Sequence, residues 1–141
     1  MTVADYDMIY ELWRSCEGMG LNNVDDSREG IEKFLKRNPD TCFIAETDGK
    51  AVGTIMAGND GRRGYIYHTA VSLEYRNMKI ASKLADKAVE ALIGCGISKI
   101  ALAVFNENDE GNSFWEKKGF AARNDIVFRI KTVCDLIDMD T

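Results

Sequence analysis

Apolar side chains recur every three or four residues in the first part of the chain, which is the spacing of one face of a helix. The pattern predicts a helix over residues 5–16, stopped by Gly18 and Gly20. A second helix is predicted over residues 25–37, with Asp26 or Ser27 as N-cap and Pro39 just beyond its end. The apolar positions that define the two faces are Met8, Ile9, Leu12 and Trp13 in the first helix and Ile31, Phe34 and Leu35 in the second.

After Pro39 the pattern changes to one typical of strands. Residues 41–60 hold two β-rich runs joined by Asp48-Gly49, a dipeptide that favours a hairpin because both positions tolerate positive φ. A second turn, Gly61 to Gly64, leads into a third run over residues 65–73. These runs predict three antiparallel strands.

The second half of the chain alternates between helix and strand. An apolar stripe predicts a helix from about Arg76 to Ile93, closed by Gly94 and Gly96. Residues 98–105 are apolar almost throughout, as in a central buried strand. A short helix over 108–120 and a last strand over 124–133 follow. No repeat or linker interrupts the sequence, so residues 1–141 are predicted to form one α/β domain.

Composition narrows the classes of function. Apolar residues make up 45% and charged residues 29% of the chain, as in soluble globular proteins. The net charge of −5 argues against a nucleic-acid partner. No apolar run approaches the roughly 18 residues that span a membrane, and no signal-like segment opens the chain, so no membrane partner and a cytoplasmic location are expected.

The four cysteines are scattered, without a Cys-x-x-Cys pair, and the chain has one histidine. This spacing predicts neither a metal site nor a disulfide framework. Small buried side chains in a reducing compartment are expected instead.

Three motifs follow one another along the second half of the chain. "RNMKIA", residues 76–81, follows a strand that ends in Ala70-Val71; Asn108 lies after the next strand; and "FWEKKGF", residues 114–120, closes the last helix. Over about residues 41–133 the chain resembles the GNAT superfamily of acetyl-CoA-dependent N-acetyltransferases, in particular its small bacterial or archaeal members. The resemblance implies the α/β GNAT fold, a mixed, mostly antiparallel sheet with a splayed central strand pair, flanked by about four helices. The first strand of the family is expected to be absent or truncated here.

The resemblance also implies a site for acetyl-CoA. A helix N-terminus offers unpaired N–H donors and the positive end of a dipole, which suits the pyrophosphate of coenzyme A. The splayed strand would leave the N–H of Val71 free to polarise the thioester carbonyl. The residues expected to bind the cofactor are Ala70, Val71, Ser72, Arg76, Asn77, Met78, Lys79, Ile80, Ala81, Ser82, Asn108 and Trp115.

Two of these residues depart from the family pattern. Lys79 replaces the first glycine of the motif, so it either adds charge beside the phosphates or weakens their binding. Trp115 stands where many members have a tyrosine that protonates the departing thiolate, and an indole is not a useful acid at neutral pH. Asn108 is expected to contact the cofactor, to cap the following helix, or to do both.

Candidates for proton transfer come from the strand before the motif. Strand alternation would place Tyr65, Tyr67, Thr69 and Val71 on one face and His68 on the other. Tyr67 and Tyr65 would then line the acceptor pocket and relay protons, or only pack. His68 titrates near neutrality and is the third candidate, against a structural role under a helix. Glu46 is a reserve base, against a solvated carboxylate.

The sequence therefore predicts an enzyme that transfers acetyl from acetyl-CoA to a primary amine, directly in a ternary complex, because no cysteine is placed by motif to carry the acyl group. The alternative is a catalytically weak acyl-CoA-binding or regulatory module of the same fold. The acceptor stays open between a small-molecule amine and a peptide or protein amine. A homodimer is left open too.

Overall fold

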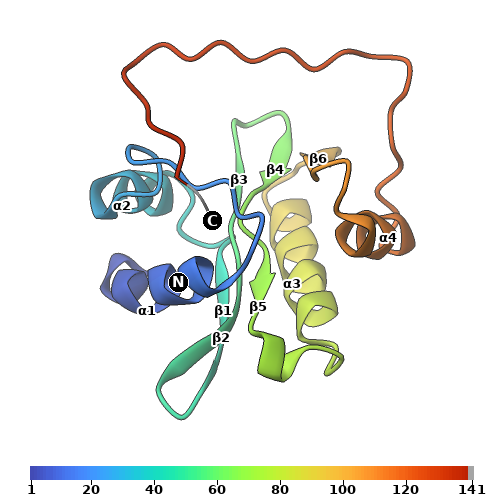
Figure 1. Cartoon of the computed structure of the whole chain (residues 1–141). Helices are drawn as coiled ribbons and strands as arrows, with labels where there is room; N and C mark the ends of the chain where they lie inside the picture. The colour runs from blue at the N-terminus through green and yellow to red at the C-terminus, as the bar shows by residue number, and fades with distance from the viewer. Residues whose placement is uncertain (140–141) are drawn as a thin grey trace.

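The computed structural model describes residues 1–139; residues 140 and 141, the last two of the predicted domain, lie outside this description. A central sheet separates two pairs of helices (Figure 1). On one face lie α1 (Tyr6–Ser15), preceded by the 3-10 turn η1 (Val3–Asp5), and α2 (Arg28–Arg37). On the other lie α3 (Ile80–Gly94) and α4 (Asp109–Lys117).

Within residues 1–139, six strands form two small sheets that continue one another, in the orders β1-β2-β5 and β3-β4-β6. The hairpin predicted at Asp48-Gly49 joins β1 to β2, and both turn residues have positive φ, 49° and 74°. The strands are β1 (Phe43–Thr47), β2 (Lys50–Ile55), β3 (Ala57–Asn59), β4 (Gly64–Ile66), β5 (Ala70–Val71) and β6 (Ile100–Leu102).

The central strands splay as the family fold requires. β4 and β6 run parallel and pair from Gly64–Ile100 to Ile66–Leu102. Beyond this point β5 pairs with β2 instead, and the chain after Leu102 leaves the sheet. The predicted GNAT fold, with helices on both faces of a mostly antiparallel sheet, is confirmed.

The predicted third strand contains a bulge between β4 and β5. Thr54 pairs with Ala70 and Ala57 pairs with Ile66, so two residues of one strand lie opposite three of the other, 67–69. One extra residue reverses the alternation of side chains. The expectation that Tyr65, Tyr67, Thr69 and Val71 share a face is therefore wrong.

Two hydrophobic clusters show which face each residue occupies. On the α1 and α2 face, Trp13 and Leu35 pack with Met56 and Ala70. On the α3 and α4 face, Leu84 and Leu92 of α3 pack with sheet residues such as Ile55 and Ile66. The alternation along residues 54–58 is regular, so the bulge lies in the opposite strand.

The helix predicted from Arg76 begins at Ile80, because Asn77 and Lys79 adopt left-handed backbone angles, with φ of 66° and 62°. Left-handed residues cannot continue a right-handed helix. The 3-10 turn η2 (Leu73–Tyr75) precedes them.

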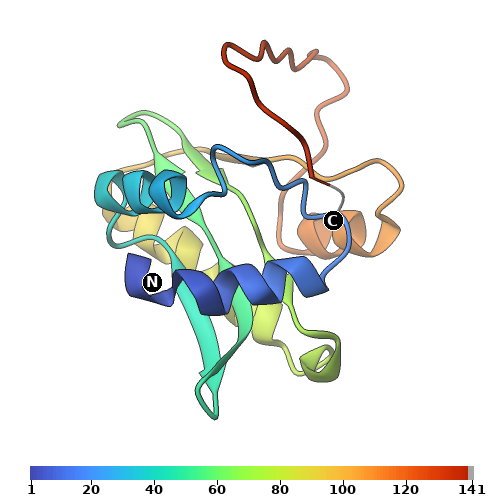
Figure 2. The ribbon, with the colours of Figure 1, turned by 60° about the vertical axis from the view of Figure 1, so that its left-hand side comes forward.

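The strand predicted over residues 124–133 is not formed. This segment leaves α4, arches away from the sheet and returns to the loop between α1 and α2, as Figures 1 and 2 show. It is held at the far end, where Met139 N donates to Leu21 O at 2.8 Å and Asn23 N donates to Ile137 O at 3.1 Å. The run has β-forming side chains, but a strand also needs a neighbouring edge, and no strand edge within residues 1–139 lies beside it.

No helix within residues 1–139 is long and apolar enough to cross a membrane.

Candidate active site

A cleft of about 1100 Å³ opens where β5 parts from β6. One wall is the end of α1 with the loop after it, residues 15–19, and the other is formed by the starts of α3 and α4. Phe105 reaches across from the splayed segment after β6: a Cβ on Gly20 would lie 3.7 Å from its ring. The cleft is large enough for a cofactor-sized ligand.

The N-terminus of α3 opens into this cleft without a side-chain cap. By contrast, Ser27 caps α2 by accepting from Gly30 N, and Asn108 caps α4 by accepting from Gly111 N. The first N–H of α3 with an intrahelical partner is that of Lys83, which donates to Lys79 O at 3.1 Å. The three preceding N–H groups of α3 therefore face the cleft as donors, which suits an anion.

The turn before α3 has the backbone of a glycine motif without the glycine. Lys79 is the N-cap of α3 at φ 62° and ψ 20°, a region that L-residues other than Asn and Asp rarely occupy. This is the position of the family's first glycine, and the conformation explains why glycine suits it. The Lys79 backbone therefore forms the turn that a glycine favours, not the predicted helix, and its ammonium adds positive charge.

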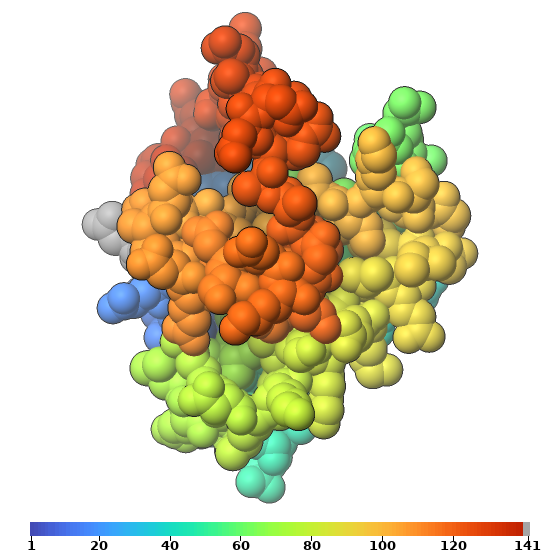
Figure 3. Space-filling model, turned by 90° about the vertical axis from the view of Figure 1, so that its right-hand side faces the viewer, coloured from blue at the N-terminus to red at the C-terminus, as the bar shows by residue number. Residues whose placement is uncertain are grey.

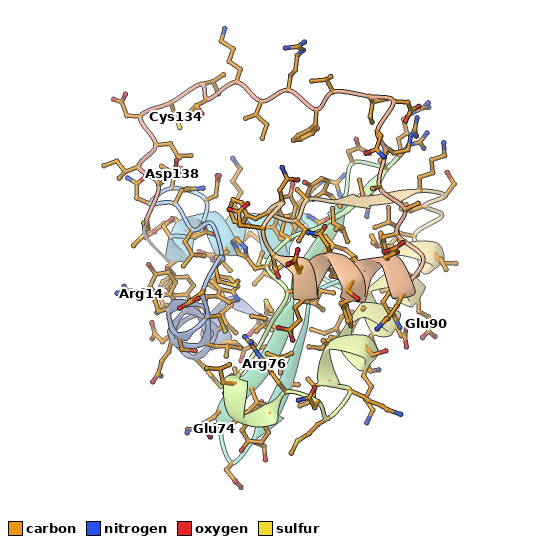
Figure 4. The ribbon with its side chains drawn as sticks, turned by 45° about the vertical axis from the view of Figure 1, so that its right-hand side comes forward. Arg14, Glu74, Arg76, Glu90, Cys134 and Asp138 are labelled. Atoms are coloured by element: carbon orange, nitrogen blue, oxygen red, sulfur yellow. The ribbon has the colours of Figure 1, made fainter. Side chains whose placement is uncertain are left out.

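The N–H of Val71 points into the cleft. Ser72 N donates to Val52 O at 2.8 Å, so residue 72 faces β2 and, by strand alternation, the N–H and C=O of Val71 face the other way. The Val71 carbonyl confirms the direction, since it accepts from Arg76 Nε at 3.1 Å. Figure 4 shows Arg76 between η2 and α4. The Val71 N–H is thus placed to polarise a carbonyl oxygen bound in the cleft.

Cys16 also lies beside the Val71 carbonyl. It is buried, and its Sγ lies 3.9 Å from Val71 O and 3.9 Å from Ser15 Oγ. Within residues 1–139 the thiol makes no hydrogen bond to a histidine, lysine or arginine.

The structure brings together ten of the twelve residues predicted to bind the cofactor. Ser72 instead lines a smaller cavity on the α1 side of the hairpin, and Met78 is 58% exposed outside the cleft. The ten that line the cleft are Ala70, Val71, Arg76, Asn77, Lys79, Ile80, Ala81, Ser82, Asn108 and Trp115.

The three residues predicted to handle protons do not line the cleft. His68 Nε2 lies 2.5 Å from Asp26 Oδ1, and its ring meets the edge of Trp13 with centroids 4.7 Å apart. Tyr67 packs against Phe34 of α2 and against Tyr65, with centroid distances of 5.6 Å and 4.6 Å. Because of the bulge, Tyr65 and Tyr67 lie on the α1 and α2 side. His68 lies there as well, on the face opposite Val71, where it was expected.

Partial burial raises the pKa of both Tyr65 and Tyr67 above the usual value for a phenol. The negative charge of Asp25 raises that of Tyr67 further. Both side chains are therefore neutral at physiological pH and available as donors rather than bases.

Trp115 is buried at the cleft wall between Phe114 and Phe120, with ring centroids 4.9 Å and 5.1 Å away. Asn108 makes the predicted cap of α4 and lines the cleft as well. Sequence reasoning missed the wall opposite, because nothing local marks the loop after α1 as lying beside β5. Residues of the cleft that were not predicted include Ser15, Cys16, Glu17, Tyr75, Phe105, Glu107 and Glu110.

Comparisons with known proteins agree with this geometry. The sequence model of the acetyltransferase (GNAT) family matches residues 6–120. The chain belongs to the GNAT family of acetyltransferases. An acetyltransferase of Photorhabdus laumondii subsp. laumondii is 35% identical over 133 residues, covering 93% of this chain and 92% of the relative. One of Sodalis glossinidius is 34% identical over 123 residues, covering 87% and 85%.

Among solved structures, a PaiA N-acetyltransferase of Thermoplasma acidophilum, in complex with coenzyme A, superimposes on this GNAT chain with a TM-score of 0.74 at 20% identity, covering 87% of each chain. This likeness supports the fold. The expectation of an acetyltransferase that uses acetyl-CoA, the co-substrate of the GNAT family, is confirmed by family membership.

Proposed function

We propose that this GNAT acetyltransferase moves the acetyl group of acetyl-CoA to a primary amine in one step, with both substrates bound together. The observation that carries the proposal is the pair of donor groups in one cleft: the uncapped start of α3 and the outward N–H of Val71. The first suits a pyrophosphate and the second suits the thioester oxygen.

The amine attacks the thioester carbon and forms a C–N bond while the carbonyl oxygen becomes an oxyanion. The Val71 N–H donates to that oxygen, which lowers the barrier where the charge develops. When the tetrahedral intermediate collapses, the C–S bond breaks and the sulfur leaves with its electron pair. The amine loses a proton and the thiolate gains one, so the amide and the thiol groups that form are both neutral.

Direct transfer is preferred to a covalent acyl-enzyme. Cys16 lies beside the Val71 carbonyl, but within residues 1–139 its thiol makes no hydrogen bond to a general base that could activate it. We expect Cys16→Ala to keep acetyl transfer, whereas an obligatory acyl-cysteine would lose it.

An amine acceptor also fits the charge of the cleft. Glu17, Glu107 and Glu110 line it, and carboxylates favour the approach of a cation. Related folds include one solved with a bisubstrate analogue of coenzyme A and acetylneamine and one named a ribosomal-protein-alanine N-acetyltransferase. We take a primary amine, small or peptide-borne, as the acceptor class. Tyr67, Tyr65 and His68 stay predictions for proton transfer. Because they lie outside the cleft, the prediction is that they exchange protons with the substrates through water.

The test is amine-dependent release of the coenzyme A thiol. The purified protein is given acetyl-CoA and a panel of polyamines, aminoglycosides, amino acids and peptides with free N-termini or lysines. Acetylated product at one equivalent per thiol released is the expected result. Tight binding of acetyl-CoA with release no faster than hydrolysis across the whole panel would favour the alternative, a weakly catalytic acyl-CoA-binding module.

A further inference from the structure

Lys118, the first residue after α4, reaches across to the start of α3. Its Nζ donates to Ser82 Oγ at 3.0 Å and to Asp86 Oδ1 at 2.5 Å. The side chain is only 21% exposed, although it carries a charge. In Figure 3 the orange α4 lies directly against the yellow-green start of α3, so this link joins two elements that flank the cleft.

The link determines what the Ser82 hydroxyl can do. The oxygen accepts from Lys118, so the hydroxyl proton points elsewhere, and within residues 1–139 it meets no acceptor. A serine in the first turns of a helix otherwise tends to donate to a carbonyl of the preceding turn. Ser82 lines the cleft beside the uncapped N–H groups of α3, so its proton is available to an anion held there.

The same link brings a positive charge to that anion. An oxygen that accepts from the Ser82 hydroxyl lies within about 6 Å of the Lys118 ammonium, the sum of the 3.0 Å contact and one ordinary hydrogen bond. Asp86, one helical turn after Ser82, contacts the same ammonium and offsets part of its charge. The two partners of the ion pair should therefore act on a bound anion with opposite signs.

We propose that Lys118 is a positioning residue for the pyrophosphate of acetyl-CoA. Lys118 directs the Ser82 hydroxyl toward the phosphate and adds its own positive charge, while Asp86 weakens that charge. This inference rests on the proposed function, since it needs the pyrophosphate at the start of α3. It assigns a role to Lys118, which stands between Lys117 and Gly119 in the "EKKGF" ending, residues 116–120.

The test measures the Kd of coenzyme A by calorimetry at low salt. Lys118→Met should weaken binding about tenfold, because both the charge and the oriented hydroxyl are lost. Lys118→Arg should restore it to within about threefold, and Asp86→Asn should tighten it about two- to threefold. A bridge that only holds α3 to α4 would be broken by both Lys118→Met and Asp86→Asn, and binding would then weaken in both.

Dephospho-coenzyme A, which lacks the 3′-phosphate, separates the two phosphate sources. The proposal predicts the same loss with Lys118→Met for this ligand. A loss that disappears with dephospho-coenzyme A would assign Lys118 to the 3′-phosphate and overturn the proposal.

The outcomes also separate this inference from the function on which it rests. A wild-type protein that does not bind coenzyme A contradicts the proposed function. A wild-type protein that binds it as well as a folded Lys118→Met variant contradicts only the role of Lys118. If Lys118→Met does not fold, Asp86→Asn decides by the sign of its effect.

Discussion

The left-handed conformation of Lys79 leads to a prediction about stability. An L-residue in this conformation costs about 1–2 kcal/mol, which glycine does not incur. Glycine also has more freedom in the unfolded chain, which offsets about 0.5–1 kcal/mol of the gain. Lys79→Gly should therefore raise the free energy of unfolding by about 0.5–1 kcal/mol, or Tm by roughly 2–4 °C in a chain of this length.

Two variants serve as controls in the same thermal unfolding assay. Lys79→Ala removes the ammonium but keeps a Cβ at the left-handed position, so its stability should stay within about 0.5 kcal/mol of wild type. Asn77→Gly should stabilise less than Lys79→Gly, because asparagine tolerates this conformation better than lysine does. Equal Tm values for Lys79→Gly and Lys79→Ala would refute the left-handed turn.

The same two Lys79 variants test the charge of the turn. Both lose the ammonium, so both should bind coenzyme A more weakly at low salt and near wild type at high salt, where surface charges are screened. A large gain in affinity for Lys79→Gly at every salt concentration would show instead that the lysine side chain obstructs the phosphates.

Three further predictions concern single side chains. Burial raises the pKa of the Cys42 thiol from 9.0 to about 11. The thiol therefore ionises first in the unfolded chain, and the free energy of unfolding should fall by about 2–3 kcal/mol between those pH values. Urea unfolding of Cys42→Ser should lack this fall. Trp115→Tyr should raise kcat if protonation of the leaving thiolate is slow, and an unchanged kcat would mean that this step does not limit the rate. His68→Gln should lower chiefly the free energy of unfolding, by about 1–3 kcal/mol, since it removes the contact with Asp26. Because Tyr67 lies outside the cleft, Tyr67→Phe should lower kcat only through a lost water-mediated proton transfer. Loss of activity only in a well-folded His68→Gln would reverse that assignment.

Local sequence signals account for much of the fold. The hairpin at Asp48-Gly49 depends on two adjacent residues, and the stripe of α3 on spacing along one helix, so both could be predicted. The bulge at residues 67–69 depends on the register between distant strands, which no local pattern reports. Similarly, residues 124–133 have the composition of a strand but not the neighbour that a strand needs.

The candidate site, like the fold, could be predicted only where local sequence determines it. The cofactor side is built largely by one continuous stretch, residues 70–82, and its predicted members mostly meet in the cleft. The opposite wall comes from residues 15–19, more than fifty residues earlier, and only tertiary packing brings it to Val71. The placement of Tyr65 and Tyr67 could not be predicted because a single inserted residue changes which face they occupy, whereas His68 keeps the expected face, opposite Val71.

The central claim is that acetyl-CoA lies with its pyrophosphate on the first turn of α3 and its thioester oxygen on the Val71 N–H. The direct measurement is the amide ¹H–¹⁵N NMR spectrum of the protein titrated with acetyl-CoA and, separately, with coenzyme A. Both ligands should shift the amides of Ile80, Ala81 and Ser82 downfield, and only acetyl-CoA should shift Val71 downfield as well. Saturating acetyl-CoA that leaves Val71 and the first turn of α3 unshifted, while amides elsewhere move, would contradict the account.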